Sequence, residues 1–554
     1  MKTHLFVCWI LYLIFGSCTA TNKQFTFATD NYLPVPKYDK GKAIFSGQIK
    51  GYTPEMTPDI QIGIPQMVMG KNDVIYVTIN EDGSFREEIP LYYSTQIKLI
   101  GKDMEQYIFL EPHKESSANI SIKDGKAKFD YTGNLAELNN EYNNGLLITE
   151  FPPTYSNSLK EVRAKLYGKT PDEYKKYWLD EYHKAIEHNN QQSVSSTAKD
   201  MANMSCAFST FHNITTYIYS QIMAYGEKHN ATREAAFAKY IDCHLPKGYY
   251  DFMNELPVNN PMALYSYKYR DVVEPTYYRT NENPLKTHYN YLMDHDYLTQ
   301  EEKELVSEYN TAYKQGKEFN KFNELMLISI KYDSIISVCQ EQLFANIKKE
   351  YSQTLKEHDY FLEWVTSRSF RPRFHNFKSL TSKQEKQLSE LTNPIVIGIV
   401  TDMNEQMKPK MKQNTGSIIC KNPTVPIEQT LDAILNEYKG KVIFVDFWAT
   451  WCGGCRQMIK EYAPIKEELV GKDIAFVYLT GTTSPLETWE KLIPEIKGYH
   501  YRLSSEQWEY LWKKFKLQGL PMYLIVDKQG QINQSFVHVN VSGLKSLLES
   551  ELEK

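Results

Sequence analysis

Hydrophobic and polar positions follow three different patterns along the 554 residues of this chain. Residues 40–132 show short apolar–polar alternations separated by turn residues. Asp82-Gly83 predicts a hairpin turn between strands at 74–79 and 85–89, and Asp124-Gly125 predicts another within 119–131. Short strands at this spacing predict a small all-β sandwich, of the kind that mediates packing or protein contacts.

Residues 133–391 lack that alternation and are rich in helix formers, so we expect a helical domain here. Its many aromatic residues indicate core packing, with a ligand pocket as the alternative. Its histidines, among them His183 and His188, show no spacing that would bind a metal ion. The predicted helical segments are 135–147, 158–188, 197–227, 231–243 and 300–358.

Residues 392–424 separate this domain from the C-terminal pattern. Met407-Lys408-Pro409-Lys410 and Lys421-Asn422-Pro423 are typical of a linker, which is our expectation. The apolar run Ile395 to Val400 is the exception, because it also fits a strand. A linker here would tether the C-terminal domain to the rest of the molecule.

Residues 425–554 alternate between buried-strand runs and helical periodicity, which predicts an α/β domain. Pro464 falls inside the first long helix and should kink it, because proline cannot donate the backbone hydrogen bond. The predicted order is strand 441–447, helix from 452, strand 473–479, helices 486–493 and 505–515, strands 519–527 and 532–537, and a closing helix 544–552.

Composition and charge narrow the functional classes. A hydrophobic content of 42% and an aromatic content of 13% exclude a mainly disordered chain. The formal net charge of −5 is small for this length, and no long basic run is present. We therefore expect no nucleic-acid partner.

The stretch Cys452-Gly453-Gly454-Cys455 carries the clearest chemical signal, because it ends an apolar strand and begins a helix. A helix N-terminus offers free N–H groups and the positive end of a dipole, and both favour a thiolate. Cys452 is therefore the expected nucleophile for thiol–disulfide exchange, and Cys455, one turn further, is the expected resolving cysteine.

This pair has two alternative interpretations, a metal site and a pair of inert cysteines. Half of a zinc site would need a second pair of ligands, but the sequence has no other Cys-x-x-Cys and no His-x-x-x-His. Two inert buried cysteines would not need two glycines between them. We expect redox chemistry with no metal and no cofactor other than the dithiol itself.

The segment from residue 425 onward resembles the thioredoxin-fold domains of TlpA/ResA-type disulfide reductases of the cell envelope. Three motifs carry the resemblance: the stretch 445–452 (Val-Asp-Phe-Trp-Ala-Thr-Trp-Cys), the Cys-x-x-Cys, and Gly519-Leu520-Pro521. A β-domain and a helical domain before such a domain also resemble the large anchored members of this family.

The resemblance implies roles for further residues. Pro521 is expected to be cis and to lie against the disulfide, and the Leu520 backbone to pair with an extended substrate segment. Trp451 is expected to shield one side of the sulfur. Asp446 is expected to be a buried acid that assists deprotonation of Cys455. The alternatives are an ordinary strand-start proline and a solvent-facing aspartate.

One departure from the family pattern leaves the direction of the reaction open. Thioredoxin itself has Gly-Pro between the cysteines, whereas this chain has Gly453-Gly454. The intervening residues influence thiolate stability and the reduction potential.

The N-terminus reads as a signal peptide at residues 1–20. Leu5 to Phe15 is apolar but too short to span a bilayer. Phe15-Gly16-Ser17-Cys18 resembles a lipobox, which implies lipidation of Cys18; cleavage after Ala20 is the alternative. Either reading places the mature protein outside the cytoplasm, in the periplasm or cell envelope.

The remaining cysteines of the mature chain are compatible with two states. They could pair in disulfides in an oxidising compartment, or remain free thiols. Cys420 lies near the redox domain and is a further candidate for exchange. The four residues are Cys206, Cys243, Cys339 and Cys420.

Three functional hypotheses follow. The first is a reductase of protein disulfides that receives electrons from a membrane thiol donor, as the resemblance implies. The second is an oxidase or isomerase that uses the same cysteines. The third is an envelope binding or structural protein in which the redox domain is accessory.

Overall fold

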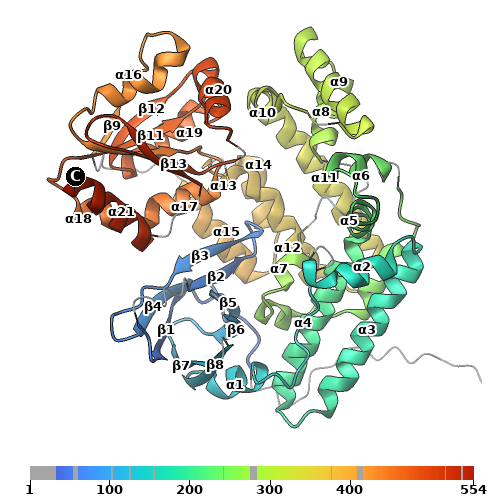
Figure 1. The fold of residues 1–554 in the computed structure, drawn as a ribbon. Helices are drawn as coiled ribbons and strands as arrows, with labels where there is room; N and C mark the ends of the chain where they lie inside the picture. The colour runs from blue at the N-terminus through green and yellow to red at the C-terminus, as the bar shows by residue number, and fades with distance from the viewer. Residues whose placement is uncertain are drawn as a thin grey trace, which may run out of the picture.

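The structure is a computed structural model, drawn as a ribbon in Figure 1. It describes residues 33–53, 60–101, 104–123, 126–153, 156–240, 243–274, 284–317, 319–375, 377–407, 416–517, 519–537 and 541–554. The predicted signal peptide, Cys18 and the Asp124-Gly125 turn lie outside these residues.

The N-terminal part contains two four-stranded sheets, in the orders β4-β1-β7-β8 and β3-β2-β5-β6. Both sheets contribute to one apolar core, for example through Phe45 and Ile120 from the first and Ile62 and Ile97 from the second. The strands are β1 Gly41–Lys50, β2 Gln61–Gln66, β3 Lys71–Tyr76, β4 Ser84–Leu91, β5 Thr95–Gly101, β6 Met104–Leu110, β7 Glu115–Lys123 and β8 Lys126–Gly133.

One predicted hairpin is present and the other is wrong. β7 and β8 pair antiparallel from Ser116 opposite Gly133 to Lys123 opposite Lys126. By contrast, β3 pairs with β2 and β4 pairs with β1, so the strands on either side of Asp82-Gly83 belong to different sheets. Only the bridge between Ile79 and Phe85 joins them. The chain crosses over because β4 buries Phe85 and Ile89 against the common core.

The middle of the chain is helical, and helices lie within each of the predicted segments. α4 is central, and most of its side chains are buried. A second, smaller core joins α8 to α11. The helices are α1 Ala136–Tyr142, α2 Lys160–Leu166, α3 Pro171–Gln191, α4 Ser196–Thr215, α5 Tyr217–His229, α6 Arg233–Lys239, α7 Tyr269–Val272, α8 Pro284–Asp294, α9 Gln300–Gln315, α10 Phe322–Lys331, α11 Asp333–Thr354, α12 Asp359–Ser367, α13 Arg371–His375 and α14 Ser382–Ser389.

The range predicted as a linker, 392–424, instead contains helix α15, Pro394–Met407. The Asn393 side chain accepts hydrogen bonds from the N–H groups of Ile395 and Val396 and so caps the helix. Ile395, Val396, Ile399 and Val400 are buried in the main helical core. Their spacing is helical, so both the linker and the alternative strand at 395–400 are wrong.

The C-terminal part is a six-stranded sheet in the order β14-β13-β10-β11-β12-β9, covered by helices on both faces. Phe444 of β10 packs with α17, α18 and α21, whereas Val445 points to the opposite face with α16 and α20. The elements are β9 Ser417–Ile419, α16 Thr430–Asn436, β10 Val442–Phe447, α17 Gly453–Glu461, α18 Ala463–Glu468, β11 Ile474–Thr480, α19 Leu486–Leu492, β12 Gly498–Arg502, α20 Ser505–Lys514, β13 Met522–Val526, β14 Ile532–Phe536 and α21 Val541–Glu553.

A kink was predicted at Pro464, and the structure has a break there, because α17 ends at Glu461 and α18 begins at Ala463. Two strands of this sheet were not predicted. β12 and β9 add to the edge of the sheet beyond β11, where β12 pairs parallel with both β11 and β9.

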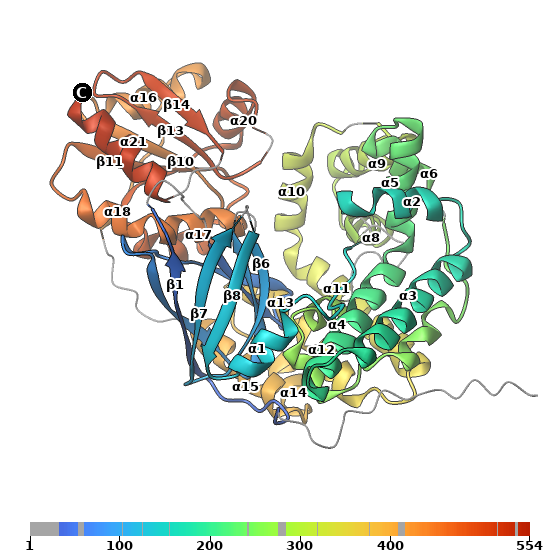
Figure 2. The same ribbon diagram turned by 60° about the horizontal axis from the view of Figure 1, so that its bottom comes forward.

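The C-terminal domain lies against the N-terminal sheets through α17. Figures 1 and 2 both show this helix beside the N-terminal strands. The Gln457 side-chain amide donates a hydrogen bond to the backbone oxygen of Val74 on β3, at 2.9 Å. The helix that begins at the Cys-x-x-Cys therefore packs on another domain of the same chain.

Candidate active site

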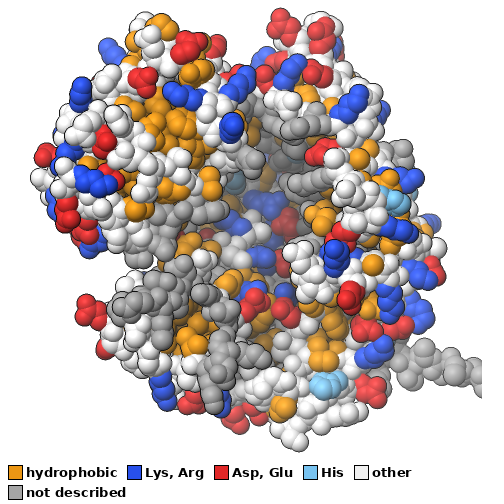
Figure 3. All heavy atoms as spheres, viewed as in Figure 1, with side chains coloured by type: hydrophobic (Ala, Val, Ile, Leu, Met, Phe, Trp, Pro, Cys, Tyr) orange, Lys and Arg blue, Asp and Glu red, His pale blue; other side chains and the backbone are white. Residues whose placement is uncertain are grey.

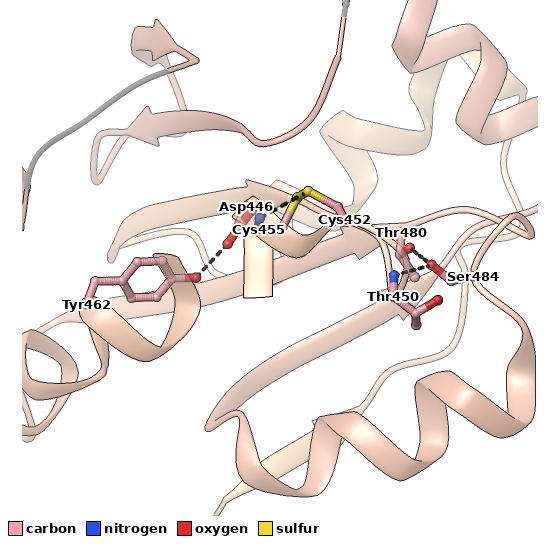
Figure 4. Close-up of a disulfide and its surroundings, with 7 residues drawn as sticks. All are labelled: Asp446, Thr450, Cys452, Cys455, Tyr462, Thr480 and Ser484. Atoms are coloured by element: carbon pink, nitrogen blue, oxygen red, sulfur yellow. Dashed lines mark hydrogen bonds between the residues drawn. A yellow bond between two sulfur atoms is a disulfide. The ribbon is translucent and has the colours of Figure 1, made fainter. Parts of the chain in front are cut away.

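Cys452 and Cys455 form a disulfide at the junction of β10 and α17, with their Cα atoms 5.3 Å apart (Figure 4). Cys452 is the N-cap of α17, and its sulfur accepts the Cys455 backbone N–H at 3.0 Å. Cys452 is 7% exposed and Cys455 is fully buried. Only the first sulfur can therefore be attacked from solvent, and the helix N-terminus would stabilise a thiolate on it.

The loop after β11 supports the disulfide from one side. The Thr450 N–H donates to the Ser484 hydroxyl at 3.0 Å, and this hydroxyl lies 2.6 Å from that of Thr480. The Arg502 guanidinium donates to the backbone oxygen of Ser484 at 2.8 Å. Sequence reasoning missed these residues, because Ser484 and Arg502 lie about 30 and 50 positions after the Cys-x-x-Cys. No local pattern links them to it.

Trp451 lies directly before Cys452 and packs partly buried against the core that contains both cysteines. Its indole N–H is buried and has no hydrogen-bond partner within the described part of the chain. Trp451 therefore packs on the same core as the disulfide that follows it in the chain.

The Leu520–Pro521 peptide bond is cis and directly precedes β13. Both residues line a pocket of about 480 Å³. The other walls of this pocket come from the end of α20 and from the edge strand β14. The remaining lining residues are Phe515, Lys516, Leu517, Gly519, Met522, Ser535, Phe536 and Val537.

Asp446 lies on β10 with no exposed surface, so the alternative of a solvent-facing aspartate is excluded. One carboxylate oxygen accepts the Tyr462 hydroxyl at 2.6 Å, and the other has no hydrogen-bond partner among the described residues. Burial raises the pKa of Asp446 to about 7, although the Tyr462 hydrogen bond and the charge of Lys466 act in the opposite direction. A carboxyl group with this pKa can accept or donate a proton at neutral pH.

Lys466 and Tyr478 extend this buried polar group, and sequence reasoning did not find them. The Lys466 ammonium donates to the Tyr478 hydroxyl at 2.8 Å and to the backbone oxygen of Lys497. Burial lowers the pKa of Lys466 to about 8. Because Tyr478 also interacts with Tyr462, the group reaches from Asp446 to Lys466. Nothing in the sequence around Lys466 or Tyr478 indicates that their side chains belong to a buried polar group.

Among the described residues, Cys206, Cys243 and Cys420 are free thiols. Cys206 and Cys339 are buried, and Cys243 and Cys420 are partly exposed. The Cys206 thiol donates to the backbone oxygen of Ile148 at 3.0 Å, and burial raises its pKa. Cys420 lies 3.7 Å from the Tyr438 hydroxyl, on the side of the sheet away from the core that contains the disulfide.

No helix among the described residues combines the length and the apolar character that a bilayer crossing needs.

Residues 440–532 match the family model described as thioredoxin-like. The chain is 26% identical over 113 residues to a thioredoxin of Coprinus comatus, which covers 20% of this chain and 83% of the relative. It is 28% identical over 103 residues to the thiol-disulfide oxidoreductase ResA of Geobacillus kaustophilus, covering 18% of this chain and 56% of the relative.

Among solved structures, the chain is similar to the thioredoxin domain of a thiol-disulfide oxidoreductase from Bacteroides vulgatus. The identity is 22%, the TM-score is 0.20, and the match covers 21% of this chain and 82% of that structure. The C-terminal domain is thus a thioredoxin-like domain, and its predicted resemblance to TlpA/ResA-type proteins is confirmed.

Proposed function

We propose that this chain is an exported thiol–disulfide oxidoreductase that reduces protein disulfides in the cell envelope. The thioredoxin-like match and the relatives named thioredoxin and ResA support a thiol:disulfide oxidoreductase. The observation that carries the proposal is the unequal exposure of the cysteine pair at the helix N-terminus, with Cys452 at 7% and Cys455 at 0%. This asymmetry is what a nucleophile and a resolving thiol require.

In the first step the reduced protein presents Cys452 as a thiolate. Its sulfur attacks one sulfur of the substrate disulfide, so a mixed disulfide forms and the other substrate sulfur leaves as a thiolate that takes up a proton. The Cys455 N–H, 3.0 Å from the Cys452 sulfur in the oxidised state, and the helix dipole both favour the thiolate before attack.

In the second step Cys455 resolves the mixed disulfide. Its thiol loses a proton to the Asp446 carboxylate, and the resulting thiolate attacks the Cys452 sulfur. The Cys452–Cys455 bond forms as the mixed disulfide breaks, and the second substrate sulfur leaves as a thiolate that takes up a proton. Two electrons have passed to the substrate. A base with a pKa of about 7 can accept this proton at neutral pH.

The substrate segment is proposed to lie along Leu520 and Pro521. The Leu520 backbone would pair with an extended chain, as in β-augmentation, and the adjoining pocket of about 480 Å³ could hold a side chain of that segment. Trp451 would cover the other side of the sulfur.

Regeneration of the dithiol needs two electrons from a thiol donor, which we propose is membrane-bound. No cofactor is needed beyond the two cysteines. Lipidation at Cys18 would keep the protein at the membrane that holds such a donor. The body formed by the sheets and helices would then hold the redox domain at the envelope.

The trapping variant Cys455→Ser tests the exchange chemistry in the full mature chain. It should retain substrate proteins as mixed disulfides that release with a reducing agent, whereas the matched variant Cys452→Ser should retain none. If Cys455→Ser traps nothing from envelope extracts or from a model protein disulfide, the proposal is wrong.

The equilibrium reduction potential of the pair decides the direction. A value near that of thioredoxin, about −270 mV, supports a reductase that needs an electron supply. A value near that of DsbA, about −120 mV, would make the protein an oxidase or isomerase. If the pair does not titrate reversibly, the redox domain is accessory and the binding-protein hypothesis remains.

A further inference from the structure

A short segment of the helical domain, formed by α13 and by residues 377 and 378, lies beside the active site although it is some 80 positions away in sequence. The guanidinium group of Arg456 lies 5.0 Å from the centroid of the Phe377 ring. Arg456 follows Cys455 directly and donates its backbone N–H to the Cys452 oxygen at 3.2 Å. The segment thus contacts the first turn of the catalytic helix.

The same segment also lies near α19, the helix that follows the loop containing Ser484. Glu487, in the first turn of α19, has a pKa lowered mainly by Lys491 and, in addition, by the charges of Lys378 and Arg373. α19 follows the loop whose Ser484 accepts the Thr450 N–H. The helical domain therefore adds a wall to the active site, between α17 and α19.

The shape of this wall is fixed by its backbone. Phe377 has φ of 53°, in the left-handed region that favours glycine. The Lys378 N–H donates to the Arg373 oxygen at 2.9 Å, which closes α13 with a C-terminal cap in which Phe377 takes the position usual for glycine. The Arg373 guanidinium donates to the Ser379 backbone oxygen at 2.8 Å, so its charge is also held on this turn.

Positive charge predominates around this wall. His375 is exposed, while Arg373 and Lys378 are partly exposed. Two carboxylates of the neighbourhood already have partners: Glu274 binds Arg371 at 2.8 Å, and Glu487 binds Lys491 at 2.6 Å.

On the α17 side, the cations also outnumber the acids. Burial raises the pKa of Asp73, and the positive charges of Lys71 and Lys460 oppose this rise. Arg456 adds a third cation near Lys71. Burial raises the pKa of Glu461 to about 7, so this carboxyl group is only partly charged at neutral pH. Figure 3 shows a hollow between the C-terminal domain and the helical domain, with Lys and Arg side chains on its floor and Asp and Glu side chains next to them.

We propose that the active site selects disulfides that lie in acidic polypeptide segments, and that Arg373 and Lys378 of the helical domain bind those segments. This inference rests on the proposed function and names its substrate class. Charges of one sign in a hollow with protein walls concentrate ligands of the opposite sign and raise association rates. Such selection is weakened by salt, because the Debye length falls from about 10 Å at 0.1 M to about 3 Å at 1 M.

The test uses the reduced full-length mature chain and two synthetic peptides, each with one disulfide between the same neighbours. One peptide carries flanking glutamates and the other carries lysines. We expect the acidic peptide to be reduced roughly ten times faster at low salt, with most of this preference lost at high salt. The double variant Arg373→Gln/Lys378→Gln should lose most of the preference.

The matched control removes two positive charges from the surface of the C-terminal domain, away from the disulfide. Lys439 and Lys472 are exposed and precede β10 and β11, at the ends of these strands opposite the disulfide. The variant Lys439→Gln/Lys472→Gln should keep the full preference. The single variant Lys378→Gln leaves the hydrogen bond from Arg373 to Ser379 intact. It should lose part of the preference for the acidic peptide, which shows that the effect does not come from misfolding of this turn.

A small neutral disulfide separates this inference from the proposed function. If all variants reduce it equally but neither peptide is preferred, or the lysine peptide is preferred, the charge selection is wrong and the reductase proposal stands. If the wild-type chain reduces neither the small disulfide nor the peptides, the proposed function fails and this inference fails with it.

Discussion

Asp446 is the residue to which we assign the proton transfer in the proposed reaction. It is fully buried on β10 and holds one hydrogen bond, from Tyr462. Burial of a carboxyl group disfavours its charged form, which is why its pKa rises from 3.8 to about 7. The same property that provides a proton acceptor near neutral pH also reduces the stability of the folded domain.

Replacement of Asp446 should therefore change how stability depends on pH. Between about pH 4 and pH 7 the folded protein retains a proton on Asp446 that the unfolded chain releases, so stability falls as pH rises through this window. Asp446→Asn should remove this loss and gain stability over wild type up to pH 7, by at most roughly 4 kcal/mol at 1.4 kcal/mol per pKa unit. Urea unfolding of the oxidised protein at pH 4 to 8 measures the difference.

The control for this measurement is Asp432→Asn, on an exposed position of α16. It should follow the wild-type pH dependence. A stability difference between Asp446→Asn and wild type that stays constant across pH would show that the carboxyl group does not titrate in this range.

Among single residues, the sequence predicted those that form a contiguous motif. It missed those that are distant in sequence and come into contact only in the folded protein. Cys452 and Cys455 are recognisable because a strand end, two glycines and a helix start are contiguous. Lys466 was missed because a lysine on a helix is usually solvated, whereas here the side chain is buried beside Tyr478 and Phe476. Phe377 and Arg456 are distant in sequence, so no local pattern could join them.

Among the elements, α15 differs most from expectation. Its apolar residues Ile, Val and Ile gave a strand-like composition, and the lysines and prolines after it suggested a linker. The helix forms because Asn393 caps it and because the buried positions recur at helical spacing. It thus completes the core of the helical domain.

This packing predicts a clear difference between two substitutions on the same helix. Ile399 is 3% exposed in the main core, so Ile399→Ala should destabilise the helical domain by about 2–5 kcal/mol. Thr401→Ala, on the exposed side, should change stability by less than about 0.5 kcal/mol. Chemical denaturation followed by far-UV circular dichroism measures both. Equal, small effects would mean that α15 does not belong to the core.

The strand predictions show a similar limit. β10, β11 and β13 were found because they are buried on both faces and read as continuous apolar runs. β12 was missed because Tyr499, His500 and Tyr501 do not read as apolar, although His500 is buried and stacks on Tyr478 with ring centroids 4.7 Å apart. The pairing of β3 and β4 with different sheets also depends on long-range contacts, which hairpin signals cannot supply.

In the whole molecule, the face of α17 that packs on β3 contains a carboxyl group poised to respond to pH. Glu461 accepts a hydrogen bond from Gln457, whose amide also reaches Val74 on β3. Tyr523 interacts electrostatically with both Glu461 and Tyr76, the last residue of β3. Burial raises the pKa of Glu461 to about 7, and one of its oxygens is buried without a hydrogen bond in the described structure.

Packing of the two domains should therefore weaken as pH rises. The packed form binds the Glu461 proton more tightly than a separated form would, so its stabilisation is present at pH 5 and lost through about pH 7. The radius of gyration from solution X-ray scattering should increase between pH 5.5 and pH 8.5. Glu461→Gln should remain compact at both values.

Glu468→Gln, on α18 and paired with Lys545 at the surface, is the control for this change. It should expand with pH as the wild type does. If wild type and Glu461→Gln have the same radius of gyration at both pH values, ionisation of Glu461 does not govern the packing.

The unequal exposure of the two cysteines has a consequence for the whole catalytic cycle. With Cys455 fully buried and Cys452 at 7% exposure, one sulfur atom must serve both the molecule that donates electrons and the molecule that receives them. The two cannot bind at the same time, so they compete, and an excess of either one slows turnover of the other. Each must also fit the same surroundings. An electron donor therefore has to imitate the features by which the substrate is recognised.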